Sequence, residues 1–155
     1  NNTSIAGLFY RAFVNEKLLR YNFARLDYQN LLVLVPGNFQ AQLGLALLNE
    51  KDKHYTEAYD GINSQIEQYP DSAMAYAARG GMEKERGMLE LAEFDYAKAM
   101  ELDAGNEDFA FNHVDILIQL GRKDEAYRDL KKLLDAGCQP GRLQNFYARL
   151  KKKKK

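Results

Sequence analysis

Apolar residues recur along this chain at spacings of three and four, the pattern of helices that bury one face. In the segment 89–103, Ala92, Tyr96, Ala99 and Met100 stand at relative positions 0, 4, 7 and 8, on one helical stripe. Strict alternation of apolar and polar residues, which is typical of a half-buried strand, does not organise the chain. The pattern therefore predicts an all-α protein.

The helical pattern repeats every 34 residues without an insertion. One column of the repeat holds only alanine, at positions 24, 58, 92 and 126. Four residues later every repeat has a large apolar or aromatic side chain, namely Tyr28, Ile62, Tyr96 and Leu130. The periodicity predicts four helical hairpins, at about residues 5–38, 39–72, 73–106 and 107–140.

Prolines and glycines mark the ends of these helices. Pro36 and Pro70 stand twelve residues after the alanine of their repeats, where a second helix should end. Gly87 and Gly121 lie 34 residues apart and suit a helix C-terminus, where the residue past the end often needs a positive φ. Both pairs support the hairpin boundaries.

These columns resemble the tetratricopeptide repeat, whose 34-residue pattern is W-x₂-L-G-x₂-Y, then A-x₃-F, then P. The third unit matches best, with Tyr76 in place of the tryptophan and Gly80 at the helix crossing. The first and fourth units depart from the pattern at its leucine position, where they have Arg11 and His113. The resemblance covers about residues 5 to 140 and implies a right-handed α-solenoid of helix-turn-helix repeats.

A further helix is expected after the last repeat. Its apolar face has large side chains at spacings of three and four, namely Leu143, Phe146, Tyr147 and Leu150. Because solenoids commonly cover their last repeat with a terminal helix, we expect a C-terminal capping helix at about 141–150. The chain is then a single domain over residues 1–150, followed at 151–155 by a basic tail that we expect to be disordered.

The charge pattern favours neither nucleic acid nor a membrane as partner. The net charge is zero, but residues 71–115 carry eleven acids and four bases, whereas five lysines end the chain. That tail lacks interleaved aromatic residues for base stacking. The longest apolar run, at 31–35, is far shorter than the roughly 18 residues of a membrane span. The compartment stays open: cytoplasmic or, if a signal peptide preceded Asn1, periplasmic or secreted.

No group of residues supplies the parts of a catalytic, metal or cofactor site. His54 and His113 fall in different repeats, and the more economical interpretation of His113 is a partly buried, hydrogen-bonded side chain. The single cysteine, Cys138, shares its repeat boundary with no histidine that could activate it. We therefore expect a chain that is not an enzyme and holds no metal or cofactor.

The resemblance implies a binding surface. In tetratricopeptide proteins the first helices of successive units line a concave groove that holds an extended peptide or a helix. Transferred to this sequence, the groove gives nine candidate partner-binding residues: Phe9, Tyr10, Phe13, Leu43, Leu47, Met74, Asp108, Phe111 and Asp115. Apolar side chains gather in its first half and carboxylates in its second, so we expect a protein or peptide partner with an aromatic or leucine anchor and basic residues.

Self-association is the alternative. Exposed apolar patches usually mark contacts, and the patch around Phe9 and Phe13 suits a second copy of the chain, or an N-terminal segment, as well as a foreign peptide. The sequence thus leaves two functions open: an interaction module for a partner, or a module that dimerises or docks within a larger protein.

Overall fold

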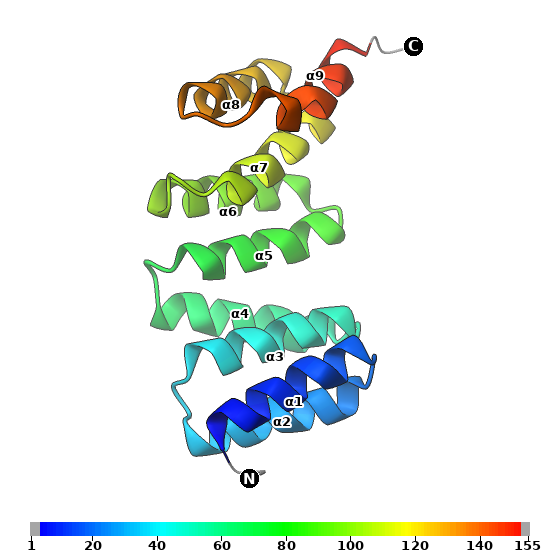
Figure 1. Ribbon diagram of the computed structural model, residues 1–155, viewed down its shortest axis with the longest axis vertical. Helices are drawn as coiled ribbons and strands as arrows, with labels where there is room; N and C mark the ends of the chain where they lie inside the picture. The colour runs from blue at the N-terminus through cyan, green and yellow to red at the C-terminus, as the bar shows by residue number, and fades with distance from the viewer. Residues whose placement is uncertain (1–3, 153–155) are drawn as a thin grey trace. The chain divides into compact units, whose positions relative to one another are not determined.

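The chain is helical throughout the part that its computed structural model describes, residues 4–152, and no strand occurs there. This confirms the predicted all-α class. Successive helices run in opposite directions along the chain (Figure 1). In order they are α1 (Ile5–Lys17), α2 (Tyr21–Leu34), α3 (Phe39–Lys51), α4 (Tyr55–Gln68), α5 (Ala73–Glu85), α6 (Leu89–Leu102), α7 (Glu107–Gln119), α8 (Lys123–Asp135), the 3₁₀ helix η1 (Pro140–Leu143) and α9 (Gln144–Lys151).

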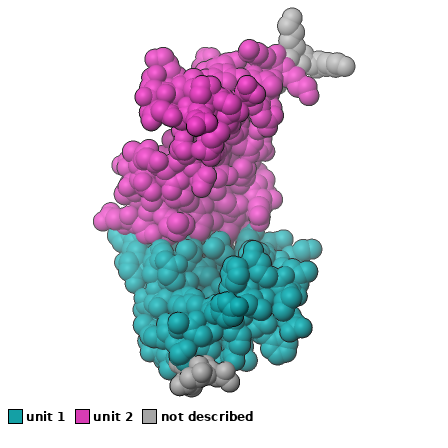
Figure 2. All heavy atoms as spheres, viewed as in Figure 1, with its two compact units in different colours: residues 1–70 teal, residues 71–155 magenta. Residues whose placement is uncertain are grey.

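The helices form two compact units, residues 1–70 and 71–155 (Figure 2). Unit 1 holds α1 to α4, and unit 2 holds α5 to α9. Each predicted repeat contains one pair of helices, while the single domain expected over residues 1–150 stays a prediction. Lys151 ends α9 and so does not belong to a disordered tail. Residues 153–155, where the rest of that tail was expected, lie outside the described residues.

The first helix of every hairpin begins with the same cap. Four residues spaced by 34 accept a hydrogen bond through the side chain from the backbone N–H three positions later, at 2.9 to 3.2 Å: Ser4, Asn38, Ser72 and Asn106. This bond satisfies one of the donors that a helix start leaves without a partner. The cap thus fixes the start of α1, α3, α5 and α7 to the repeat register.

The turn inside each hairpin also repeats, and it requires a left-handed residue. Leu19, Lys53, Gly87 and Gly121 occupy one column and have φ of 60°, 62°, 77° and 76°. The positive φ predicted for the two glycines is confirmed. A residue with a Cβ adopts this conformation at a cost of roughly 1–2 kcal/mol, which Leu19 and Lys53 therefore bear in the first two hairpins.

Small residues occupy the sites where paired helices cross. The four alanines of the repeat column, Ala24, Ala58, Ala92 and Ala126, are fully buried. A Cβ added at Gly80 would lie 2.8 Å from the Tyr96 ring, closer than real Cβ contacts. The predicted stripe thus faces the core, and its small members leave room for the second helix.

The terminal helix covers the last repeat, as predicted. Leu143 and Leu150, at 0% and 3% exposure, share one apolar cluster with Ala110, Leu130 and Leu133 of the fourth hairpin. The 3₁₀ turn that begins at Pro140 brings the chain from α8 into this helix. The end of unit 2 is therefore closed by its own chain.

A charged pair links the two helices of three hairpins, and its members are always 16 residues apart. Arg11 donates to Asp27 at 2.9 and 2.7 Å, and Arg79 donates to Asp95 at 2.8 Å through two nitrogens. Asp27 and Asp95 are 2% and 1% exposed, so the bonds to arginine compensate the removal of these side chains from water. The departures from the repeat pattern at its leucine position are thus one half of an ion pair.

The fourth hairpin builds the same link with histidine. The His113 ring bonds Asp129 of α8 through Nδ1 and Glu93 of α6 through Nε2, the latter at 2.8 Å. Arg122 also reaches Glu93, at 2.9 Å. His113 is 8% exposed, which agrees with a partly buried, hydrogen-bonded residue. Burial lowers the pKa of His113, but the bonds to Asp129 and Glu93 and their charges outweigh it, so the pKa is raised above its ordinary value.

We expect Lys53→Gly to raise the free energy of unfolding by about 0.5–1 kcal/mol, because glycine removes the left-handed strain. Glycine also loses more backbone entropy on folding than lysine, which offsets part of this stabilisation. The matched reverse change, Gly121→Lys, should lower the free energy of unfolding by a similar amount. Urea denaturation of both variants measures the effect. Changes of the same sign in the two variants would contradict it.

We also expect the stability of unit 2 to depend on the protonation of His113. A raised pKa means that this stabilisation is fully present below about pH 6.5 and is lost as the pH rises through the folded-state pKa. His113→Arg installs the residue of the equivalent positions 11 and 79, which does not titrate in this range. Urea denaturation across a pH series should therefore show a fall above neutral pH that the variant lacks. Parallel curves for the two proteins would refute the role of His113.

Candidate functional site

The apolar residues predicted at the start of the groove form a hollow in unit 1. Phe9 and Phe13 lie one turn apart on α1, and Leu43 and Leu47 one turn apart on α3. Together with Tyr28, Gln40 and Gly44 they line a space of about 380 Å³. Phe13 is 54% and Leu47 37% exposed, so much of the lining is open to a ligand. The structure thus brings together four of the nine candidates.

Two residues that the sequence analysis did not propose shape this hollow. A Cβ at Gly44 would lie 2.6 Å from the Tyr28 ring, so the ring packs directly against the α3 backbone. The Tyr28 hydroxyl donates to Glu16 at 3.3 Å. Burial and the neighbouring Glu16 carboxylate raise the pKa of Tyr28 to about 12, so it remains a hydrogen-bond donor at neutral pH. The column of large residues could have indicated Tyr28, whereas its contact with Gly44 needed the structure.

Charged residues surround the same hollow. The Lys17 ammonium lies 5.3 Å from the centre of the Phe13 ring, and the Lys51 ammonium lies 4.0 Å from Glu16. Tyr10 is also on α1 and is 72% exposed, but it does not line the hollow. The arrangement offers apolar side chains at the centre and charged groups of both signs near them.

The candidates of unit 2 lie on two helices, α5 and α7. Met74 is half exposed on α5, and Asp108 lies in the first turn of α7. The chain's own C-terminal segment contacts Phe111: the Phe146 ring centre is 6.0 Å from that of Phe111, and the Arg142 guanidinium is 4.7 Å from it.

Asp115 is held by two cations of unit 2. Lys84 lies 2.7 Å and Arg149 2.6 Å from its carboxylate oxygens. Burial raises the pKa of Asp115, but the hydrogen bonds and charges of Lys84 and Arg149 outweigh this effect and lower it. The charge of Asp115 is therefore balanced inside the chain, which the sequence expectation of an acidic surface did not include.

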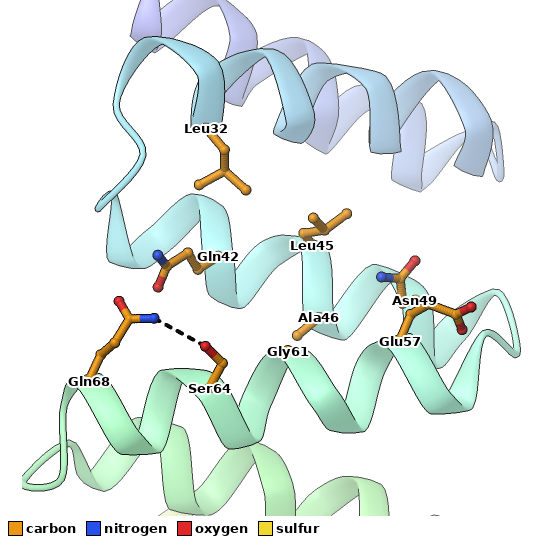
Figure 3. Close-up of a pocket in the computed structure, with 9 residues that line it drawn as sticks. All are labelled: Leu32, Gln42, Leu45, Ala46, Asn49, Glu57, Gly61, Ser64 and Gln68. Carbon is orange, nitrogen blue, oxygen red and sulfur yellow. Dashed lines mark hydrogen bonds between the residues drawn. The ribbon is translucent and has the colours of Figure 1, made fainter.

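A second hollow of unit 1, of about 200 Å³, lies among α2, α3 and α4 (Figure 3). Its lining residues are Leu32, Gln42, Leu45, Ala46, Asn49, Glu57, Gly61, Ser64 and Gln68. Gln68 donates to Ser64 at 3.2 Å. Leu45 and Gly61 occupy the columns in which the other hairpins carry the cation and the aspartate. The hollow therefore lies where the second hairpin lacks the ion pair that the other three hairpins have. A comparison of the repeat columns in the sequence could have indicated this position.

The described residues include no cluster that could hold a metal ion. In the range 4–152, no three His, Cys, Asp or Glu side chains are placed to hold a metal ion. The Cys138 thiol is buried, and its hydrogen bond to Glu107, together with burial, raises its pKa, which disfavours the nucleophilic thiolate. No helix in the same range is long and apolar enough to cross a membrane.

No protein-family model and no curated protein sequence matches the chain. Solved structures resemble it at low identity. MamA 41-end from Desulfovibrio magneticus RS-1 is 20% identical, with a TM-score of 0.70, over 86% of this chain and 75% of that chain. A tetratricopeptide repeat protein from Parabacteroides merdae ATCC 43184 is 21% identical, with a TM-score of 0.73, over 96% of this chain and 58% of its own.

A third similar structure contains a bound peptide. The first tetratricopeptide domain of Spaghetti (RPAP3), bound to the HSP90 peptide SRMEEVD, is 21% identical to this chain, with a TM-score of 0.65, over 78% of this chain and 96% of that one. Its likeness extends to the helical framework. Together with the 34-residue hairpins, these comparisons show that the chain has the tetratricopeptide-repeat fold, an all-α solenoid that ends in a capping helix.

Proposed function

We propose that the chain is a non-catalytic interaction module that binds a peptide or a helix of a partner protein, with its main anchor in the α1–α3 hollow. The observation that carries this proposal is the hollow itself, in which Phe9, Phe13, Leu43 and Leu47 surround about 380 Å³. The peptide bound to the similar Spaghetti domain supports the use of this fold for such a task.

The hollow suits a large apolar anchor. An aromatic or leucine side chain placed there would cover Phe13 and Leu47, which water now contacts. Such buried contacts near the centre of an interface usually carry most of the affinity. The anchor of the partner is therefore a hydrophobic side chain that contacts both α1 and α3.

The residues that line the hollow distinguish it from a carboxylate clamp. A clamp needs polar and cationic side chains, whereas Phe9, Phe13 and Gly44 occupy this part of the surface. The acidic character of the peptide SRMEEVD is thus no guide to the ligand of this chain. Met74, Asp108, Phe111 and Asp115 remain candidates for further contacts.

The preference for basic residues in the partner then depends on Asp108 more than on Asp115. Asp115 already binds Lys84 and Arg149, so a ligand cation would have to displace one of them. No ion pair of Asp108 occurs among the described residues. A lysine or arginine of the ligand would gain most at Asp108, and this contribution should shrink as salt is raised.

The test is a screen of an array of twelve-residue peptides, followed by titration of the best one. We expect selected peptides to combine an aromatic or leucine residue with lysine or arginine. Phe13→Ala should weaken the binding of the best peptide by about 30-fold, equivalent to roughly 2 kcal/mol, because it removes one wall of the hollow. Fluorescence anisotropy of the labelled peptide measures this loss.

The matched control is Phe94→Ala, which removes another exposed phenylalanine, at 65% exposure, from α6. It should leave the affinity within about twofold. A screen that selects acidic peptides, or binding that is indifferent to both Phe9→Ala and Phe13→Ala, would show that the hollow is not the anchor site.

A further inference from the structure

The outer face of α2 is apolar and exposed. Five large side chains of this face are between 50% and 79% exposed: Leu19, Phe23, Leu26, Val33 and Leu34. Phe23, Leu26 and Val33 follow the spacing of a helical seam, with Asn30 completing the series 23, 26, 30, 33, and Leu19 lies in the turn that precedes the helix. Asn22 and Gln29 are also exposed on this side of α2, and Arg20, which adjoins Leu19 at the start of the helix, is an exposed charge.

The repeat itself does not require an apolar face here. The columns of Phe23, Leu26 and Val33 are charged in the second and fourth hairpins, where they hold Glu57, Asp60, Glu67, Glu125, Arg128 and Asp135. The third hairpin is mixed, with Leu91, Phe94 and Glu101. The first hairpin alone is apolar in all three columns, although the fold accepts charge at each of them.

The position of this face within the hairpin shows what kind of contact it makes. In the second hairpin Glu57, Ser64 and Gln68 occupy the columns of Phe23, Asn30 and Leu34 and line the hollow that α4 shares with α2 (Figure 3). Asp60 and Glu67, in the columns of Leu26 and Val33, are exposed and do not line it. Part of this side of a second helix therefore faces the preceding helix pair of the stack. For α2 no preceding pair occurs among the described residues, where Phe23 and Leu34 are 63% and 50% exposed.

We propose that two copies of the chain associate through the outer faces of their α2 helices. A second copy presents the same apolar side chains, so the contact removes apolar surface of both copies from water, and the exposed charge beside it is Arg20 at the start of each α2. A head-to-tail arrangement could not bury α2 against the last repeat, because α9 already covers that repeat with Leu143 and Leu150. The pairing is therefore isologous, α2 against α2.

The area of the face is sufficient for such a contact. Its five apolar side chains are each at least half exposed. Burying them in both copies would remove on the order of 1,000 Å² from water, the lower range of specific interfaces. We therefore expect a reversible dimer. This contact is separate from the α1–α3 hollow, since no residue of the apolar α2 face lines that hollow.

Sedimentation equilibrium of the full chain, from low to high micromolar concentration, tests the proposal. We expect a dimer in which Phe23→Glu combined with Leu26→Asp raises the dissociation constant by about 100-fold or more. Both changes install the residues of the same columns in the second hairpin, so the hairpin should fold normally. Circular dichroism and thermal denaturation check this, and Val33→Glu, which alters the most exposed of the five side chains, is an independent second variant.

Two controls separate this contact from the proposed peptide site. Phe13→Asp should leave the dimer intact and abolish peptide binding, whereas the α2 variants should do the reverse. Phe94→Glu changes an equally exposed phenylalanine of α6 and should alter neither. A chain that is monomeric at every concentration would overturn the proposal, and so would a dimer that Phe13→Asp dissociates or that survives the folded α2 variants.

Discussion

The close approach of the two helices in each hairpin is the constraint on which the other features depend. It is permitted by the fully buried alanines at 24, 58, 92 and 126. A larger side chain at such a site would separate the helices or overpack the contact, at roughly 1–3 kcal/mol. In the first, third and fourth hairpins a residue of the first helix binds the residue 16 positions later. Between hairpins, the Tyr28 ring of α2 packs against Gly44 of α3 and so closes one side of the α1–α3 hollow.

The four hairpins share this framework and differ mainly in the residues that occupy a few positions of the repeat. The first and third hairpins carry an arginine–aspartate pair, the fourth a histidine that titrates, and the second neither charge. The outer columns of the second helix vary from fully apolar in α2 to charged in α8. The repeated columns thus account for the fold, and the columns that differ between hairpins account for the surfaces proposed to bind a peptide or a second copy.

The features that could be predicted are those that recur with the period of the chain. The alanine column, Gly87 and Gly121 indicated the helices and their ends because each obeys a local rule that holds in every repeat. The clustering of Phe9 and Phe13 with Leu43 and Leu47 also followed, since it needs only the helical face and the order of the repeats.

What could not be predicted depends on contacts that occur once. Asp115 was expected as an open acidic group, but its partners, Lys84 and Arg149, come from the preceding hairpin and the terminal helix. The sequence indicated that a capping helix exists, yet its apolar spacing says nothing about where its arginines lie. Arg11 and His113 looked like departures from the pattern until Asp27 and Asp129 supplied their partners. A comparison of columns 16 residues apart would have found both pairs.

The second hairpin has Leu45 and Gly61 in the two columns where the other hairpins carry a cation and an aspartate. This difference limits which segments could be exchanged between repeats. Leu45→Arg alone would place a cation beside the α2–α4 hollow with no carboxylate at position 61, and Gly61→Asp alone would leave an anion without its cation. In the first and third hairpins the aspartate of the pair is buried, and loss of one partner of a buried pair costs about 3–5 kcal/mol, so the transfer of a helix that carries only one member is not neutral. The two positions lie on different helices of one hairpin, which makes the complete hairpin, rather than the single helix, the smallest module that can be exchanged between repeats without creating an orphaned charge.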